Sequence, residues 1–487
     1  MSEQGDVKGL AVRGAALLSI RQILVGLVTV AGIITLPLLL SPAEFSLYGY
    51  VNTVVLVGAA LGDLGLGAYL IKKRATDRDI AGSFALQLAF WLPASLLALA
   101  LAIVLDPFGF STLTSALLLL ALLLLALQAL PTALLEKEMA FKRISAVEVV
   151  QRIVLVTIAI TLAVVDPAQW SIPVAAAAAA LVGYPAMMVA ARWRWLPRFA
   201  PGEPLFRGFS SQWWQARIAN QASYAAYPLL GGLLFTASEV GLIVWALAIT
   251  SIPTYLAPMV SRATYPALAR SSIAERVSIF SNLFRSLLLF GAPLLAGLIV
   301  AAEPLTLEIF GDAWADGVPL LRLESITSFI GIGLNLLMPL MFLTAPPARI
   351  KWMTVGNTAG IVLLSLVLAP LISFKAISVA TIVTGLVLLV SFDRIVRREI
   401  AYSPVRDMLP AGAGLILAVA VCLPAALEFD SLAGGLAAGV LAAVIQLATT
   451  WGLKGGINLK TAISRIRPAE TAVAIDPVAN RDPADDF

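Results

Sequence analysis

Residues 112–135 read TLTSALLLLALLLLALQALPTALL, a stretch of 24 residues without a charged side chain. A helix that crosses the hydrocarbon core of a bilayer needs about 20 predominantly apolar residues. A helix is also compatible with lipid because it satisfies its backbone hydrogen bonds within its own segment. This stretch therefore predicts a transmembrane helix.

The composition of the whole chain supports the same class of protein. Of its 487 residues, 60% are hydrophobic and 13% are charged, whereas soluble globular chains are about 45–50% apolar and about 25% charged. The mean hydropathy is +0.93. We predict an all-α integral membrane protein. The net charge of +4 is too small to indicate a nucleic-acid partner.

The residues that carry much of enzyme chemistry are scarce. The chain has no histidine, the commonest metal ligand and the usual acid or base at neutral pH. Its one cysteine, Cys422, lies in an apolar run and can form neither an intramolecular disulfide nor a CxxC site. No nucleotide-binding motif is visible in the sequence. We expect no enzymatic activity, no metal and no cofactor.

About fourteen stretches of span length follow one another along the chain. The first stretch is too long for the core of a cleavable signal peptide and lacks a small-residue cleavage site. The predicted spans are residues 15–40, 45–71, 80–105, 112–135, 144–165, 172–191, 210–235, 240–265, 280–302, 319–343, 350–372, 377–395, 408–427 and 432–451.

Lysine and arginine are concentrated in every second connection between spans. This pattern predicts the orientation of the protein in the membrane, because short cytoplasmic loops are enriched in these residues. The N-terminus and every even-numbered connection carry cations, among them Lys72, Arg143, Arg194 and Arg397. The odd-numbered connections carry acids and one clear cation, Lys375. We expect both termini in the cytoplasm and an even number of spans.

The two halves of the chain resemble each other. Residues 41–50 read SPAEFSLYGY after the first span, and residues 235–245 read FTASEVGLIVW after the seventh. Glu44 aligns with Glu239, and Arg21 with Arg217. Six spans per repeat make the repeats parallel. We predict an N-terminal lobe (1–200), a C-terminal lobe (201–400), two additional helices (401–455) and a largely disordered cytoplasmic tail (456–487).

Charged residues inside the spans are candidate functional residues, because each costs about 3 kcal/mol or more in a bilayer and usually faces an aqueous cavity. Arginines from both lobes would line a cationic cavity and bind phosphate with paired hydrogen bonds. The acids could couple an ion or form structural pairs; Arg152 could instead pair with Glu148, and Arg262 and Arg285 could reach the interface. The arginines are Arg21, Arg152, Arg217, Arg262, Arg285 and Arg322, and the acids are Asp63, Glu148 and Glu324.

Polar and aromatic residues gather in the seventh span. Asn220, Gln221 and Tyr224 lie deep in it and would suit a path for sugar, since amides hydrogen-bond and aromatic rings stack. Trp213 and Trp214 lie at the cytoplasmic end of the span, where an aromatic belt is expected.

Four stretches resemble polysaccharide transporters of the Wzx/PST type, which share the MOP superfamily with MATE exporters and lipid II flippases. They are LGDLGLGAYL at 61–70, ALLEKEMAFKRIS at 133–145, SEVGL at 238–242 and FGDAWADGVPLLR at 310–322. The resemblance implies a flippase of the bacterial inner membrane. Its substrate would be a polyprenyl-diphosphate-linked oligosaccharide for exopolysaccharide, capsule or O-antigen synthesis. The resemblance also implies that membrane lipid, a polysaccharide polymerase and a chain-length regulator are partners of the protein.

Three alternative classes fit the sequence less well; one of them, a scaffold without a transport role, would not explain arginines in both lobes. An ion-coupled, MATE-like exporter of small molecules would favour acids over arginines inside the membrane, and this sequence has more arginines. A membrane oligosaccharide polymerase or ligase would carry a large extracytoplasmic loop with catalytic residues, and the odd-numbered connections are all short.

Overall fold

The computed structural model describes residues 24–455 except for 63, 68–69, 71–75, 106–109, 139, 167–169, 199–213, 216–217, 219–224, 226, 255–267, 269–270 and 429–430. Every regular element in this part of the chain is helical. The prediction of an all-α membrane protein is confirmed: ten segments are long and apolar enough to cross a membrane, and one of these contains two helices. The count of fourteen spans stays a prediction.

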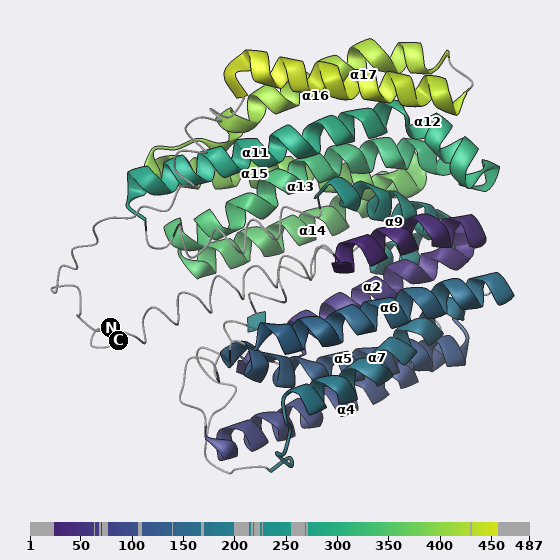
Figure 1. Ribbon diagram of the computed structural model, residues 1–487, viewed down its shortest axis with the longest axis vertical. Coiled ribbons are helices and arrows are strands. Elements are labelled where there is room, and N and C mark those ends of the chain that lie inside the picture. Colours follow the sequence, from purple (N-terminus) through teal and green to yellow (C-terminus); the bar gives the residue numbers. More distant parts are fainter. Residues whose placement is uncertain are drawn as a thin grey trace.

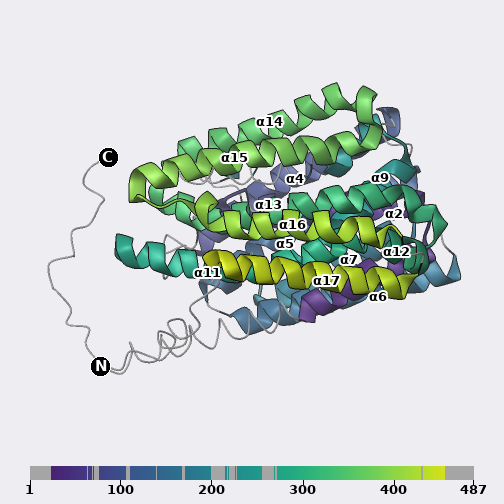
Figure 2. The same ribbon diagram turned by 90° about the horizontal axis from the view of Figure 1, so that it is seen from above.

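The long helices lie side by side with their axes along a common direction (Figures 1 and 2). Serine or threonine caps several of their N-termini, and a hydroxyl there accepts a hydrogen bond from an unpaired backbone N–H. In chain order the helices are α2 (Pro42–Leu61), α4 (Asp77–Leu105), α5 (Thr112–Lys137), α6 (Phe141–Val165), α7 (Ser171–Ala190), α9 (Ala237–Ser251), α11 (Ile273–Val300), α13 (Val318–Thr344), α14 (Pro347–Ile372), α15 (Ala376–Ile400), α16 (Pro404–Ala426) and α17 (Leu432–Thr450).

The helices form two groups that meet between α2 and α9. Figure 1 shows α4 to α7 on one side of this contact and α11 with α13 to α17 on the other. One buried cluster runs from α6 and α7 through α2 and α9 to the start of α13, so the two groups share a continuous core. A second cluster joins α11, α13, α15, α16 and α17. The final helix pair, α16 and α17, is therefore packed into the C-terminal group.

Three short helical segments connect α11 to α13. They are α12 (Ala302–Leu305), followed by a π-helical turn (Thr306–Phe310), and a 3-10 turn (Asp312–Gly317). Gly311 stands between the turns with φ +88°, which a side chain would make unfavourable. These turns lie at the same end of the bundle as the starts of α2 and α9, the end that carries the acidic connections.

The second predicted span needs a correction. It was predicted to continue to residue 71, but α2 ends at Leu61. Leu64 has φ +54° and Gly65 has φ +74°, both in the left-handed region, so the helix cannot continue through them. The apolar sequence predicted the length of the segment and not the break inside it.

Candidate functional site at the lobe interface

The two helices at the lobe interface begin in the same way. Ser41 caps α2, and a carboxylate oxygen of Glu44 accepts a hydrogen bond from the Ser41 backbone N–H at 2.8 Å. Thr236 caps α9, and Glu239 accepts from the Thr236 backbone N–H, also at 2.8 Å. Each pair forms a capping box, which satisfies two unpaired donors at once. The acids aligned by the internal repeat thus hold equivalent positions in the two lobes.

α2 and α9 pack side by side in the same direction and touch closely near their N-termini. A Cβ added at Gly241 would lie 1.6 Å from the carbonyl oxygen of Pro42. A Cβ added at Gly49 would lie 2.4 Å from a methyl carbon of Val244. These glycines let the two lobes meet without space for a side chain, so the interface is closed at this end.

Aromatic rings fill the same end of the interface. The ring of Trp314 lies 5.8 Å from Phe45 of α2 and 5.3 Å from Trp245 of α9, and Phe310 lies 5.4 Å from Trp245. Trp245 and Trp314 are fully buried. A Cβ at Gly317 would come within 2.8 Å of Trp245, so the FGDAWADG stretch fits only with glycine there. We call Phe45, Trp245, Phe310 and Trp314 the aromatic plug.

The other end of α2 is held by side chains from other elements. The Gly62 carbonyl accepts from Gln87 at 3.0 Å and from Trp91 at 2.9 Å, both on α4. The Leu61 carbonyl accepts from the indole of Trp214 at 3.0 Å. These donors satisfy carbonyls near the break, which lipid could not do. Trp214 therefore joins the start of the seventh span to the second, in addition to any role in an aromatic belt.

The loop stretch at 133–145 supports the same region. Lys137, at the end of α5, donates from Nζ to the Leu70 carbonyl at 2.7 Å. Leu134 and Leu135 are buried. Each of the four sequence stretches that resemble polysaccharide transporters thus contributes to the break in α2 or to the closed end of the interface.

Three of the six predicted cavity arginines fall in the described part of the chain. Arg285 of α11 pairs with Asp407 of α16 at 2.6 Å. Arg322 of α13 lies 3.3 Å from Glu303 of α12. Arg152 and Glu148 are half-buried on α6, one helical turn apart. The other predicted residues, Arg21, Asp63, Arg217, Asn220, Gln221, Tyr224 and Arg262, lie outside the described residues.

Glu324 is a fully buried acid on α13. One of its carboxylate oxygens accepts a short hydrogen bond from the hydroxyl of Ser378 on α15. The other oxygen, and the buried hydroxyl of Tyr227, make no hydrogen bond of standard geometry within the described residues, although the hydroxyl of Thr327 interacts with both groups. Burial of a carboxylate without a cation is costly, so this acid differs from Glu303, which has an arginine partner.

Two buried acids that the sequence did not indicate lie near the cationic end of the C-terminal lobe. Asp407 accepts from the hydroxyls of Ser281 at 2.5 Å and Tyr402 at 2.6 Å, in addition to its pair with Arg285. Burial, reinforced by the neighbouring Asp407 carboxylate, raises the pKa of Tyr402 above its usual value.

The second of these acids, Asp393, accepts from Ser403 at 2.6 Å, from the Val405 N–H at 3.1 Å and from Arg397 at 2.7 Å. One signal was present in the sequence, because Asp393 and Arg397 are four residues apart on one helix. Together, Asp393 and Asp407 fasten the start of α16 to the helices beside it.

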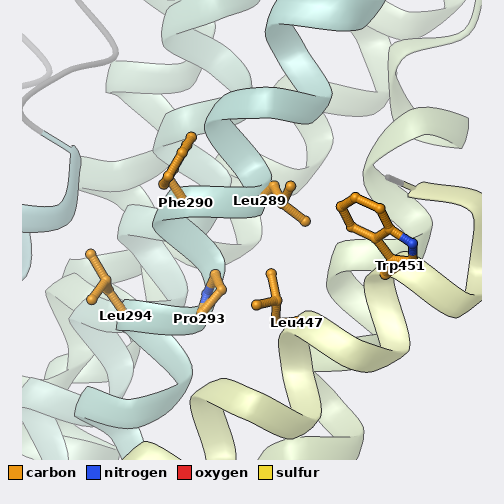
Figure 3. A pocket seen from close by; sticks show the side chains of 6 residues that line it. All are labelled: Leu289, Phe290, Pro293, Leu294, Leu447 and Trp451. Atoms are coloured by element: carbon orange, nitrogen blue, oxygen red, sulfur yellow. The ribbon is translucent and has the colours of Figure 1, made fainter. Parts of the chain in front are cut away.

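A pocket of about 410 Å³ lies away from the lobe interface, between α11 and α17 (Figure 3). None of the predicted site residues lines it. Its walls are apolar except for one indole, so it offers no group that would bind a phosphate or a sugar by charge. The lining residues are Leu289, Phe290, Pro293, Leu294, Leu447 and Trp451.

The fold is that of a multi-pass helical membrane protein whose two helical groups meet at α2 and α9. It is similar to the structure of the lipid II flippase MurJ in an inward closed conformation, with a TM-score of 0.73 over 90% of this chain and 98% of that chain, at 11% sequence identity. A MATE multidrug resistance transporter in an inward-facing conformation aligns with a TM-score of only 0.27 and 14% identity, over 94% of this chain and 100% of that chain.

The sequence places the chain in a family. Residues 36–319, more than half of the chain, match the family described as "Polysaccharide biosynthesis protein", and the protein belongs to this family. It is 27% identical over 150 residues to the teichuronic acid biosynthesis protein TuaB of Bacillus subtilis (strain 168). That match covers 30% of this chain and only 31% of the relative.

Proposed function

We propose that this protein is a flippase for polyprenyl-diphosphate-linked oligosaccharide repeat units in the bacterial inner membrane, with both termini in the cytoplasm. The units would serve exopolysaccharide, capsule or O-antigen synthesis, in cooperation with a polymerase and a chain-length regulator. Membership of the polysaccharide biosynthesis family supports the substrate class.

The observation that carries the proposal is the one-sided closure of the lobe interface. α2 and α9 touch through glycine at the acidic end, and the aromatic plug covers that contact. Toward the cationic end, α2 breaks after Leu61. An interface closed at one end and interrupted at the other suits alternating access, in which two lobes rock about a central site.

The proposed site is a cationic cavity between the lobes. Arg21 and Arg217 are its main phosphate-binding residues, one from each lobe, with Arg152 and Arg262 as further candidates. Arg285 and Arg322 already have carboxylate partners, so a role in the cavity would require them to exchange those partners for phosphate. Asn220, Gln221 and Tyr224 would contact the sugars.

A leaflet assay tests this function directly. Purified protein in proteoliposomes is given a fluorescent polyprenyl-diphosphate oligosaccharide, and the fraction that reaches the opposite leaflet is measured with an impermeant quencher. We expect the Arg21→Ala, Arg217→Ala double variant to lose most of this movement. The Arg394→Ala, Arg398→Ala double variant, which removes two exposed arginines of α15, is the charge-matched control. Full flipping by the first variant would contradict the cavity; no flipping by the unmodified protein would contradict the function.

We propose in addition that Glu324 couples transport to an ion gradient. Its complete burial beside the hydroxyl of Ser378 supports a site for a proton or a cation. Glu324→Gln retains an acceptor for Ser378 and removes the charge. In the leaflet assay, this variant should lose the response to an imposed proton or sodium gradient and keep slow downhill flipping. Glu303→Gln is the control, and an unchanged gradient response in Glu324→Gln would contradict the coupling.

A further inference from the structure

The residues that follow α7 form a segment without regular secondary structure at the cationic end of the N-terminal lobe. Residues 192–198 read RWRWLPR and run from the end of α7 toward the start of α4 (Figure 1). Arg192, Arg194 and Arg198 are exposed, whereas Trp193 and Trp195 are half-buried. Exposed arginines therefore alternate with half-buried tryptophans along residues 192–195. We call residues 192–198 the tryptophan–arginine strap.

The tryptophans fix the strap to α4. The ring of Trp193 lies edge-on to Phe84 at 5.0 Å, and its indole donates to the Trp195 carbonyl at 2.9 Å. The indole of Trp195 donates to Asp77 at 3.0 Å, and the Arg198 N–H donates to the Ala81 carbonyl at 3.3 Å. The strap is therefore held in place by contacts that do not involve the side chains of Arg192 or Arg198.

Arg192 occupies a position that favours glycine. The Arg192 N–H donates to Val189 and the Trp193 N–H to Met188, which is the hydrogen-bond pattern of a Schellman motif at the end of α7. Arg192 has φ +50° at the left-handed position of this motif. Arginine there costs free energy that glycine would not.

Other cations surround the strap. Arg143, in the first turn of α6, donates to the carbonyl of Ala190 at 3.3 Å, and Lys142 beside it is exposed. Arg78 is exposed next to Asp77. Arg194 lies 3.5 Å from Asp77, but this pair is largely in solvent and therefore weak. Exposed Glu136 and Glu138 lie at the end of α5, before Lys142, but the cations named here outnumber these acids and Asp77 together.

Exposed apolar side chains accompany the cations of the strap. Leu196 is 74% exposed and Val189, in the last turn of α7, is 79% exposed. Tryptophan is enriched at the level of the lipid headgroups, where its ring is apolar and its N–H can hydrogen-bond. We propose that the strap binds the headgroup phosphates of anionic phospholipids, with Arg192 and Arg198 as the main contacts. This site is separate from the proposed cavity and does not depend on the flippase function.

The test compares two lipids that differ in headgroup charge. Full-length protein in a neutral detergent is titrated with dioleoylphosphatidylglycerol or with dioleoylphosphatidylcholine, and the unfolding temperature is followed at each concentration. We expect phosphatidylglycerol to stabilise the protein at lower concentration. In Arg192→Gln, Arg198→Gln the half-maximal phosphatidylglycerol concentration should rise roughly thirtyfold, as expected for two interfacial arginines. The Arg394→Gln, Arg398→Gln variant, with two arginines removed from the C-terminal lobe, should behave as the unmodified protein.

A single variant separates lipid binding from folding. Arg192→Gly relieves the left-handed strain and removes the charge, so it should raise the unfolding temperature without lipid and weaken the response to phosphatidylglycerol. Equal stabilisation by the two lipids would overturn the proposal, as would equal losses in both double variants. Displacement of the lipid effect by millimolar inorganic phosphate would also overturn it, because the site would then recognise free phosphate.

Discussion

Single glycines decide how closely the two lobes approach. At Gly241, the nearest atom to an added Cβ is a backbone oxygen of Pro42, which cannot rotate away. At Gly331 of α13, an added Cβ would meet nothing within 4 Å. The two positions therefore form a matched pair for the same substitution.

Gly241→Ala should destabilise the protein by about 2 kcal/mol, as overpacking of a close contact commonly does. Gly331→Ala should be neutral or stabilising by up to about 1 kcal/mol, because alanine favours the helix. Thermal unfolding of both variants in the same detergent checks this. Equal unfolding temperatures for the two variants would contradict the tight α2–α9 contact.

Asp407 is the buried acid whose loss should matter most for stability. Its side chain is only 7% exposed and pairs with Arg285, whereas the Glu303 side chain is 46% exposed beside Arg322. Asp407→Asn should cost about 3 kcal/mol, because it leaves a partly buried guanidinium without its counter-ion. Glu303→Gln should cost less than about 1 kcal/mol, as exposed pairs do. Thermal unfolding distinguishes the two, and the reverse order would contradict the assignment.

At the scale of elements, the break at the end of α2 depends on donors from α4. Gln87 is fully buried and donates both to the Gly62 carbonyl and to the Ala126 carbonyl of α5, the latter at 2.7 Å. Trp91 donates only to Gly62. One side chain therefore joins α2, α4 and α5 where the backbone of α2 leaves the helix.

Gln87→Leu should destabilise the protein by about 2 kcal/mol, because the buried Ala126 carbonyl loses this donor. Trp91→Tyr keeps an aromatic ring, and Gln87 still satisfies Gly62, so its cost should be smaller. Unfolding temperatures of the two variants, measured together, check the order. A larger loss in Trp91→Tyr would show that ring packing outweighs the hydrogen bonds here.

At the scale of the whole molecule, the proposed alternating access requires α2 and α9 to separate near their N-termini. A disulfide across this contact would prevent that movement, and bridged cysteines have Cβ atoms about 3.5–4.5 Å apart. Gly49 and Val244 face each other there and belong to different lobes. Cys422, the chain's one natural cysteine, is buried and can be replaced by serine to avoid other pairings.

In the Cys422→Ser background, Gly49→Cys with Val244→Cys should cross-link under oxidation and stop flipping in the leaflet assay. Reductant should restore it. Each single cysteine variant serves as the control for the substitution itself. Unchanged flipping by the fully cross-linked protein would show that the two helices do not need to part.

The sequence by itself determined the protein class, most of the helix positions and the separation of charge between the two ends of the bundle. Apolar length and charge alternation are local properties, and a bilayer acts on them directly. The internal repeat in the sequence also aligned Glu44 with Glu239, and each acid completes a capping box in the structure. This motif can be predicted because four consecutive residues encode it.

Only the tertiary structure decided which polar groups meet. It paired Arg285 with Asp407 and Arg322 with Glu303, buried Glu324 beside Ser378, and ended α2 at Leu61. Residues more than a hundred positions apart make the Arg285–Asp407 contact, and no periodicity in the sequence specifies it. A charged residue inside a span is expected to need a charged partner or water. The packing of the helices alone decides which partner it has.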